Sequence, residues 1–467
     1  MKGILVLVVV LWGGVALYQR GKPLPVGLSL DGPRRPGVGV RFLADRTFER
    51  DGRVVSEQVI FAHVCRLIDE ARHFVILDFF LFNNLHGQEQ PFLPLTEELT
   101  RRIIAKRQRA PQVEMVLITD EINRQYGAYE FEHLQRLREA GVRVVYTDLT
   151  RLRDSNPLYS AWWRLCCQWL GSEGQGWLAS PFAANGPRFS LSAYLNLLNF
   201  KANHRKVVVN EAEALVTSAN PHDASSWHSN VGLLAAGQVV GDIVASEAAV
   251  AAMSDQPLPR FQVVSPPGPG DGTEAQVLTE GKIKARLLAA IGVCGPADQV
   301  ELAMFYLSDR EVIEALLAAA ARGSTVRLLL DPNRDAFGRA KNGIPNRPVA
   351  SELVRRSGGR VQVRWHRTHG EQFHSKLALV CQGERVLVMA GSANLTRRNL
   401  GDLNLETDLA VEARGDAEVV REARDYFQRL WENRDGQYSE DFAVLREDSP
   451  GRLWLYRFQE WSGMSTF

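Results

Sequence analysis

Short apolar runs alternate with amphipathic segments along the chain, and the same order of runs occurs twice. The first series predicts helices at 57–71, 95–108 and 129–140, which precede strands at 75–82, 113–119 and 142–146 in turn. The second series predicts helices at 284–291, 309–321 and 349–357, which precede strands at 300–307, 326–330 and 361–365. This repetition predicts an α/β protein with two duplicated domains, each a mixed, mostly parallel sheet flanked by helices.

Segments rich in Pro and Gly separate the two series. We expect a linker at 21–39, a first domain at 40–260, a second linker at 261–275 and a second domain at 276–467. The second linker contains Ser-Pro-Pro-Gly-Pro-Gly-Asp-Gly at 265–272. A chain of 467 residues is long enough for two substantial cores.

The first domain carries an insertion. Val361 starts the last strand of the second series and lies 13 residues before His374, whereas Val142 lies 62 residues before His204, so about 49 residues are extra, roughly at 149–200. Aromatic and apolar residues recur there at helical spacing, at Tyr159, Trp162, Trp163, Cys166 and Leu170. Two interpretations remain open: a helix packed on its own domain, or an aromatic helix at a membrane surface.

The amino-terminal residues 1–20 contain an uncharged apolar run at 3–18 that follows Lys2. Its length lies between a signal-peptide core and a full membrane span, and no clear small-x-small cleavage site follows, which favours an uncleaved transmembrane anchor over a cleaved signal. More cations follow the run than precede it, among them Arg20 and Lys22, so the positive-inside tendency predicts a cytoplasmic main body, with a periplasmic one as the alternative.

Composition narrows the classes of function without selecting one. Lys and Arg total 55 against 54 acidic residues, so no overall positive field attracts nucleic acid. Five cysteines show no metal-type spacing, and an odd number is a poor disulfide framework. Any phosphate binding must therefore be local.

One motif occurs in both halves. The first copy reads Asn-His-Arg-Lys-Val-Val-Val-Asn-Glu from residue 203 and reaches Thr-Ser-Ala-Asn at 217–220; the second reads Phe-His-Ser-Lys-Leu-Ala-Leu-Val-Cys from 373 and reaches Gly-Ser-Ala-Asn at 391–394. In an extended segment residues i and i+2 share a face, so His204 lies with Lys206 and His374 with Lys376. An imidazole beside an ammonium suits a phosphate better than a core.

Two such copies match the needs of phosphodiester chemistry. When a His attacks the phosphorus, negative charge spreads over the non-bridging oxygens and must meet cations and neutral donors. Two Lys and two Asn can supply them, and the second His can protonate the leaving alcohol and deprotonate the incoming one. This chemistry needs no metal or other cofactor, and one site between the two halves is the simplest arrangement.

The paired His-x-Lys and Ser-x-Asn stretches in duplicated α/β halves resemble the phospholipase D superfamily, and the apolar amino terminus resembles its bacterial members related to cardiolipin synthase. The resemblance implies a covalent phosphohistidine that water or an alcohol resolves, a phospholipid substrate and a bacterial inner membrane location. It implies His204 as nucleophile, His374 as acid and base, and as phosphate ligands Lys206, Lys376, Asn220, Asn394, Ser218 and Ser392. It does not specify the lipid headgroup, the acceptor or the oligomeric state.

The sequence departs from this family pattern at both Asp positions. Glu211 stands in the first copy and Cys381 in the second. If the Asp mainly braces the fold, activity survives; if it tunes a catalytic group, the second half is impaired. Glu406 follows the second motif and is expected to support the site by orienting His374 or Lys376. Thr217 also replaces the glycine present as Gly391.

Other residues have weaker claims to function. His366 and His369, with His374, suggest a metal cluster but lack a partnered carboxylate. His222 and His228 follow the first Asn and either line the pocket mouth or lie on an exposed loop. Asp120 and Asp331 end equivalent strands, where either a site or a helix cap explains them.

Two other functions remain as alternatives to the phospholipid enzyme. One is a nuclease of the same fold, which the neutral charge balance and the apolar amino terminus disfavour. The other is a lipid-binding or scaffold protein whose site has decayed at Cys381.

Overall fold

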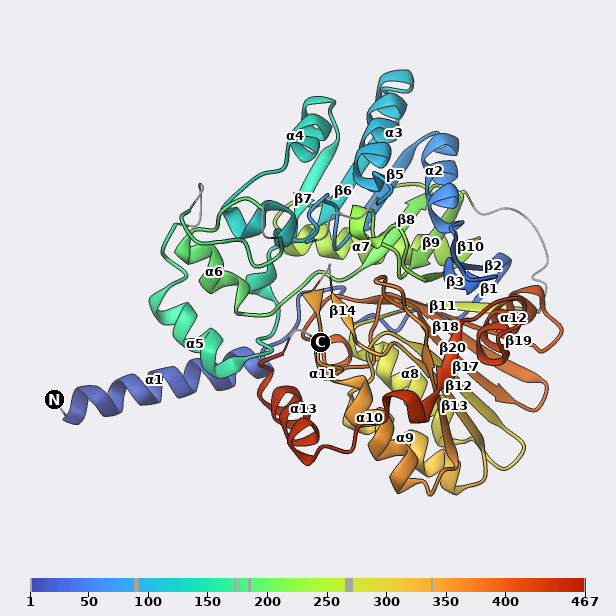
Figure 1. The fold of residues 1–467 in the computed structure, drawn as a ribbon. Helices are drawn as coiled ribbons and strands as arrows, with labels where there is room; N and C mark the ends of the chain where they lie inside the picture. Colours follow the sequence, from blue (N-terminus) through green and yellow to red (C-terminus); the bar gives the residue numbers. More distant parts are fainter. Residues whose placement is uncertain are drawn as a thin grey trace.

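Two sheets form the body of the protein (Figure 1). The computed structural model describes residues 2–87, 92–171, 174, 176–183, 186–264, 272–336, 339–465 and 467. The first sheet has, in spatial order, β2 (Val38–Ala44), β10 (Val231–Ala236), β9 (Glu213–Thr217), β8 (Lys206–Asn210), β5 (Phe74–Phe79), β6 (Glu114–Thr119) and β7 (Arg143–Tyr146).

The second sheet repeats this order and adds a strand at each edge. It runs β1 (Arg35–Pro36), β11 (Glu274–Thr279), β19 (Thr407–Arg414), β18 (Arg385–Gly391), β17 (Lys376–Gln382), β12 (Gln299–Met304), β13 (Thr325–Leu330), β16 (Val361–His366) and β20 (Ser439–Asp441). Two small hairpins lie outside the sheets: β3 (Arg46–Arg50) with β4 (Arg53–Glu57), and β14 (Asp335–Ala336) with β15 (Arg339–Ala340). The matching strand orders confirm the predicted duplication.

Both sheets are mixed, as predicted, but parallel pairs are the minority. They join only β5, β6 and β7 in the first sheet and β12, β13 and β16 in the second. The expectation of mostly parallel sheets was wrong because each His-x-Lys strand returns as a hairpin, β8 with β9 and β17 with β18. The alternating strands and helices before each motif correctly predicted the parallel part only.

Helices cover the outer face of each sheet and two more lie between the sheets (Figure 1). The outer helices are α2 (Ile60–Glu70), α3 (Leu95–Arg109) and α4 (Glu132–Glu139) on the first sheet, and α8 (Gly281–Gly292), α9 (Arg310–Ala321) and α10 (Asn346–Arg356) on the second. Between them lie α7 (Gln238–Met253) and α12 (Glu418–Glu432), whose apolar side chains join both inner sheet faces in one core. The remaining helices are α1 (Lys2–Gly21), α5 (Pro157–Cys166), α6 (Leu191–Leu197), α11 (Arg397–Leu400) and α13 (Pro450–Ser462).

The two halves exchange elements at their border. Helix α7 contacts β11 of the second half, and α12 contacts β2 of the first. Within the predicted linker 21–39, Arg35–Pro36 pairs with β11, so this segment adds an edge strand to the second sheet. Of the second predicted linker, residues 265–271 lie outside the described part of the chain, and the predicted domain boundaries stay a prediction. The exchange places the inner faces of both sheets against each other.

Helix α1 is long and apolar enough to cross a membrane and extends away from the body (Figure 1). The predicted aromatic helix of the insertion is α5, which packs along α1, and the Trp12 indole donates a hydrogen bond to the Leu158 carbonyl at 3.0 Å. Trp163 is buried and Trp162 is exposed. A membrane anchor is consistent with α1, while the side of the membrane that holds the body stays a prediction.

Candidate active site

Each motif His lies in the loop just before its strand, β8 or β17, and a carboxylate at the end of a neighbouring parallel strand holds that loop. Asp120 follows β6 and accepts a hydrogen bond from the Asn203 backbone N–H at 2.6 Å. Asp331 follows β13 and accepts one from the Phe373 backbone N–H at 2.7 Å. Each residue thus positions the loop immediately before a motif His, and Asp120 also caps the short helix Glu121–Gly127, so the helix-cap explanation holds for Asp120 as well.

Both lysines adopt the same arrangement beneath their histidines. The Lys206 ammonium donates to the His204 carbonyl at 2.6 Å, and the Lys376 ammonium donates to the His374 carbonyl at 2.8 Å. Each Nζ also lies over a Phe ring, of Phe80 or Phe305 respectively. Both side chains are buried, and no carboxylate forms an ion pair with either one among the described residues. Glu406 and Asp408 act on both lysines only from beyond ion-pair distance, so a bound anion would give each ammonium a direct ion-pair partner.

The two histidines have different partners, and each partner comes from the other half. His204 Nδ1 lies 2.9 Å from Glu406 Oε1, whereas His374 Nδ1 lies 3.2 Å from Asn230 Oδ1. The side chain of Glu406 therefore contacts His204, whereas the sequence predicted that it orients His374 or Lys376; its charge also acts on Lys376. In both cases an Nδ1–H that donates to oxygen leaves the Nε2 lone pair for chemistry. A carboxylate stabilises a positive imidazole better than an amide does, so the pair is asymmetric.

The predicted serines lie behind these partners. The Ser392 hydroxyl donates to Glu406 at 2.5 Å and accepts from the Thr407 backbone N–H at 2.9 Å. The Ser218 hydroxyl contacts Asn230 at 3.2 Å and accepts from the Val231 backbone N–H at 2.9 Å. Neither serine lines the cavity described below. Their hydroxyls contact the partners of the histidines, and their role as phosphate ligands stays a prediction.

Burial disfavours the protonated, positively charged forms of the motif histidines and lysines. Burial, and then the charge of Lys206, lower the pKa of His204 well below its usual range; burial and Lys376 do the same for His374. Burial lowers the pKa of Lys206 to about 7 and that of Lys376 well below its usual range. Burial raises the pKa of Glu406. Both imidazoles are therefore neutral near pH 7, and a bound anion would favour protonation of the lysines.

A cavity of about 610 Å³ opens onto both motif histidines. Asn220 and Asn394 lie in its wall, and the backbone N–H of Leu81 donates to Asn220 Oδ1 at 3.1 Å. Much of the apolar lining comes from the insertion, through Pro181, Phe182, Tyr194, Leu197, Leu198 and Phe200. Among the described residues that line the cavity, none is Asp or Glu, while Lys201, Lys341 and Arg398 add further cations. An anionic group with an apolar chain fits this lining.

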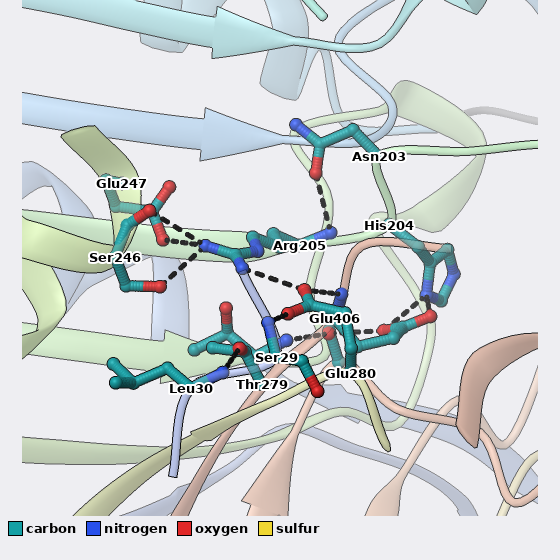
Figure 2. Close-up of polar contacts among 12 residues, drawn as sticks. Ser29, Leu30, Asn203, His204, Arg205, Ser246, Glu247, Thr279, Glu280 and Glu406 are labelled. Atoms are coloured by element: carbon teal, nitrogen blue, oxygen red, sulfur yellow. Dashed lines mark hydrogen bonds and ion pairs between the residues drawn. The ribbon is translucent and has the colours of Figure 1, made fainter. Parts of the chain in front are cut away.

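A buried ionic cluster fixes the first motif between the halves (Figure 2). Arg205 is fully buried, and its guanidinium pairs with Glu280 at 2.8 Å and with Glu247 of α7 at 3.3 Å. Glu280 Oε1 also accepts the Glu406 backbone N–H at 3.1 Å, which joins the cluster to the partner of His204. At the equivalent place in the second motif, the Ser375 hydroxyl contacts the Tyr426 hydroxyl at 2.7 Å. At the residue between the motif His and Lys, the first motif is therefore held by charged side chains and the second by neutral hydroxyls.

The two departures from the family pattern lie far from the cavity. Glu211 accepts backbone N–H groups at the start of β5, from Arg72 at 2.7 Å and His73 at 3.3 Å. Cys381 is buried at the far end of β17, five residues beyond Lys376 and so roughly 16 Å away along the strand. Neither residue lines the cavity, and the groups that do are in place without a carboxylate at position 381.

The remaining sequence candidates divide between cavity and core. His222 and His228 are buried and line the cavity, so neither lies on an exposed loop. His228 Nδ1 accepts the Gln372 backbone N–H at 3.3 Å, and its Nε2 has no hydrogen-bond partner among the described residues. His366 is buried and stacks on Phe373. In the part of the chain that the structure describes, no three His, Cys, Asp or Glu side chains are grouped to hold a metal ion.

Sequence reasoning missed Asn230. Its position in the sequence could have identified it. Asn230 directly precedes β10, the next strand after the first Ser-x-Asn, just as Glu406 directly precedes β19, the next strand after the second. The two residues differ in charge, so the pattern of residue types conceals their equivalence. Arg398, a half-buried cation in the cavity wall, was also missed, because the short helix at the equivalent place in the first half, Asp223–Ser225, contains no Arg or Lys.

The lowered lysine pKa values predict a pH dependence of anion binding. The pKa of Lys206 in the free protein is about 7, and a bound dianion raises this pKa. Above pH 7, the Lys206 amine therefore takes up a proton when the dianion binds. We expect the affinity for tungstate, which stays a dianion, to fall by up to about tenfold per unit as the pH rises from 7 to 9. Calorimetry in buffers of different ionisation enthalpy measures both affinity and proton uptake. Lys206→Met should weaken binding and flatten this dependence; a pH-independent wild-type affinity would contradict the assignment.

Comparisons with known proteins agree with this architecture. Residues 287–431 match the model of the family described as "Cardiolipin synthase, PLD-like domain", and this range contains the second motif. No curated protein matches the sequence. The crystal structure of phosphatidylserine synthase from Haemophilus influenzae Rd KW20 resembles the chain with a TM-score of 0.56 at 11% identity, over 93% of this chain and 96% of that one. This likeness shows the fold of the whole chain.

Two further structures are more distant. Polyphosphate kinase from Porphyromonas gingivalis gives a TM-score of 0.48 at 14% identity, over 91% of this chain and 53% of that one. The phospholipase D family member Nuc from Salmonella typhimurium gives 0.27 at 20% identity, over 36% of this chain and 97% of that one.

Proposed function

We propose that this chain is a member of the phospholipase D superfamily and transfers a phosphatidyl group from a membrane phospholipid to an alcohol or to water. The observation that carries the proposal is the cavity itself: both motif histidines open onto a space with an apolar wall and no lining carboxylate among the described residues. A phospholipid presents an anionic phosphodiester next to an apolar chain. A single-stranded nucleic acid would instead need a groove with cations and stacking rings along its length.

In the proposed first step, His204 Nε2 attacks the phosphorus and the bond to the headgroup oxygen breaks. That oxygen takes a proton from His374 Nε2, and the headgroup alcohol leaves. Lys206, Lys376 and the amide groups of Asn220 and Asn394 meet the non-bridging oxygens. The phosphate charge raises the pKa of His374, which is lowered in the free protein, so substrate binding prepares the acid.

In the second step an alcohol or water attacks the phosphohistidine and gives its proton to His374. The P–N bond to His204 breaks, the new phosphodiester forms and both imidazoles return to their starting state. Glu406 accepts from His204 Nδ1 throughout and stabilises the positive charge of the phosphorylated ring. Asp120, Asp331, Ser218 and Ser392 act as positioning residues, because they touch the motif loops or the partners of the histidines.

Transfer to a primary alcohol tests the proposal directly. The full chain is placed in vesicles that contain a fluorescent phosphatidylglycerol, and ethanol is added. Transfer to the alcohol should form phosphatidylethanol, whereas hydrolysis by water yields phosphatidic acid. Parallel reactions with single-stranded DNA test the nuclease alternative. Absence of both lipid products, with cleavage of DNA, would overturn the proposal; absence of any product, with tungstate still bound, would favour a binding protein.

A further inference from the structure

Helix α13 carries a row of exposed aromatic side chains. Trp454, Phe458 and Trp461 are 66%, 38% and 75% exposed, and their spacing of four and three residues places them on one face. Ring centroids lie 5.4 Å apart for the first pair and 6.2 Å for the second. A soluble helix seldom exposes such a row, because burial of each ring from water is favourable. The row therefore requires an apolar environment outside the chain.

The opposite face of α13 is fixed to the body beside the cavity. Tyr456 is fully buried, and its hydroxyl donates to the Ser308 carbonyl at 3.2 Å. The buried Glu460 accepts from the Ser308 hydroxyl at 2.9 Å and from the Arg397 backbone N–H at 2.8 Å. Ser308 follows Tyr306 by two residues, and Tyr306 lines the cavity. The aromatic row is thus held in one orientation next to the cavity wall.

The end of α13 touches the insertion next to α1. Gly463 has φ +76°, and a Cβ there would lie 1.9 Å from the Ser155 carbonyl oxygen, so only glycine allows this approach. Ser155 lies two residues before α5, and its hydroxyl contacts the Phe200 carbonyl at 3.1 Å, beside another part of the cavity wall. Figure 1 shows α5 and α13 near the carboxyl end of α1. The carboxyl end of α13 therefore lies against the insertion, whose helix α5 packs along α1.

The insertion contributes exposed rings to the same region. Trp162 of α5 and Trp169 just after it are exposed, and α5 itself packs along α1. Trp side chains favour the boundary between headgroups and acyl chains, because they combine a large apolar ring with one N–H donor. Helix α1, which is apolar enough to span a bilayer, fixes the body at that boundary. These rings and the α13 row together are called the aromatic surface below.

We propose that the aromatic surface lies in the interfacial layer of the bilayer, with α13 as a second membrane contact besides α1. The body then meets the membrane along two helices that border the cavity wall, and a lipid passes from the bilayer into the cavity without crossing water. A second protein could cover the same rings, but their place beside the insertion that packs along α1 assigns them to the lipid. The contact itself does not depend on the proposed reaction.

Photochemical labelling tests the contact without turnover. The full chain is placed in vesicles of phosphatidylcholine and phosphatidylglycerol that contain a phospholipid with a diazirine near the top of its acyl chain. Peptide mapping after illumination should find lipid adducts on residues 450–464 and on α1. The triple variant Trp454→Ser, Phe458→Ser, Trp461→Ser should lose the adducts on α13 and keep those on α1. Adducts on α1 alone, or crosslinks between the α13 helices of two copies, would overturn the proposal.

Enzyme kinetics distinguish a loss of membrane contact from a loss of catalysis. This second experiment rests on the proposed function, because it measures turnover of a phospholipid. For the triple variant we expect the KM for lipid in vesicles to rise by roughly tenfold, which corresponds to about 1.4 kcal/mol of lost surface binding. The rate with a short-chain phospholipid below its micelle concentration should stay unchanged. Val293→Ser is the matched control, since Val293 is an apolar residue 73% exposed after α8 and outside the aromatic surface. Trp461→Ser alone serves if the triple variant fails to fold, and an unchanged KM in a folded variant contradicts the contact.

Discussion

Replacing His204 with Asn is expected to abolish formation of a covalent lipid adduct, whereas His374→Asn should let that adduct accumulate. The substrate for this test is a phosphatidyl ester of p-nitrophenol, whose leaving group needs no proton. His374→Asn should then release one equivalent of p-nitrophenol in a burst and stop, because no base activates the incoming alcohol. His204→Asn should show no burst, with turnover reduced by about 10⁴-fold or more. Mass spectrometry of the trapped protein should find the adduct on His204.

His133→Asn provides the matched control for this pair. His133 is also buried with a pKa lowered by burial, to about 4, but it does not line the cavity. Its ring nitrogen contacts the Phe82 carbonyl at 2.8 Å, so the variant tests the cost of losing a buried imidazole in general. It should retain turnover near the wild-type rate. A burst from His204→Asn, or an adduct found on His374 in the wild type, would reverse the assigned roles.

The order of helices and strands was predictable because the spacing of apolar residues along the sequence reflects local secondary structure. The strand predicted at 326–330 is β13 (Thr325–Leu330), and the helix predicted at 95–108 is α3 (Leu95–Arg109). Pairing direction was not predictable in the same way. Hairpins β8–β9 and β17–β18 follow from turns after each motif strand, and the alternation of helices and strands that precedes them carries no information about those turns.

The histidines, lysines and asparagines could be predicted as a set, but their partners could not. Two copies of His-x-Lys with a trailing Asn are a strong local signal, and the structure brings both copies to one cavity. Glu406 contacts His204 across the border of the halves, although 202 residues separate them in sequence. Such a contact depends on how the two sheets face each other. The sequence around Glu406 alone does not indicate how the two sheets face each other.

The significance of Cys381 likewise required the structure. Its position in the sequence, shortly after the second His-x-Lys, left open whether a residue there braces the fold or tunes a catalytic group. An extended strand separates the two by its full length, and Cys381 ends in the core. Cys381 is therefore close to Lys376 in the sequence but far from the cavity in space. The opposite holds for the insertion, whose distant residues Phe182 and Tyr194 form the apolar wall of the site.

Glu406→Gln is expected to slow turnover by about 10²–10⁴-fold with little change in KM, because the uncharged amide no longer stabilises the positive ring of phosphorylated His204. The substitution preserves shape, so the fold should persist, with thermal unfolding as the check. Asn230→Asp should act in the opposite sense on the other histidine. A carboxylate beside His374 raises its pKa, and the alkaline limb of the kcat profile should move upward by about one pH unit or more. An unchanged rate in Glu406→Gln would show that the contact only positions the ring.

The double variant that combines Glu406→Gln with Asn230→Asp gives the sharpest test of why the two histidines differ. The motif copies share their lysines, asparagines and serines, so the charge of the partner is the main difference between the rings. If that charge decides which histidine attacks, part of the adduct should move to His374 in the double variant. If the adduct stays on His204, the buried charges of Arg205, Glu247 and Glu280 behind the first motif, which have no charged counterpart at Ser375, decide instead. The location of one phosphohistidine thus distinguishes control by the partner from control by the surrounding charges.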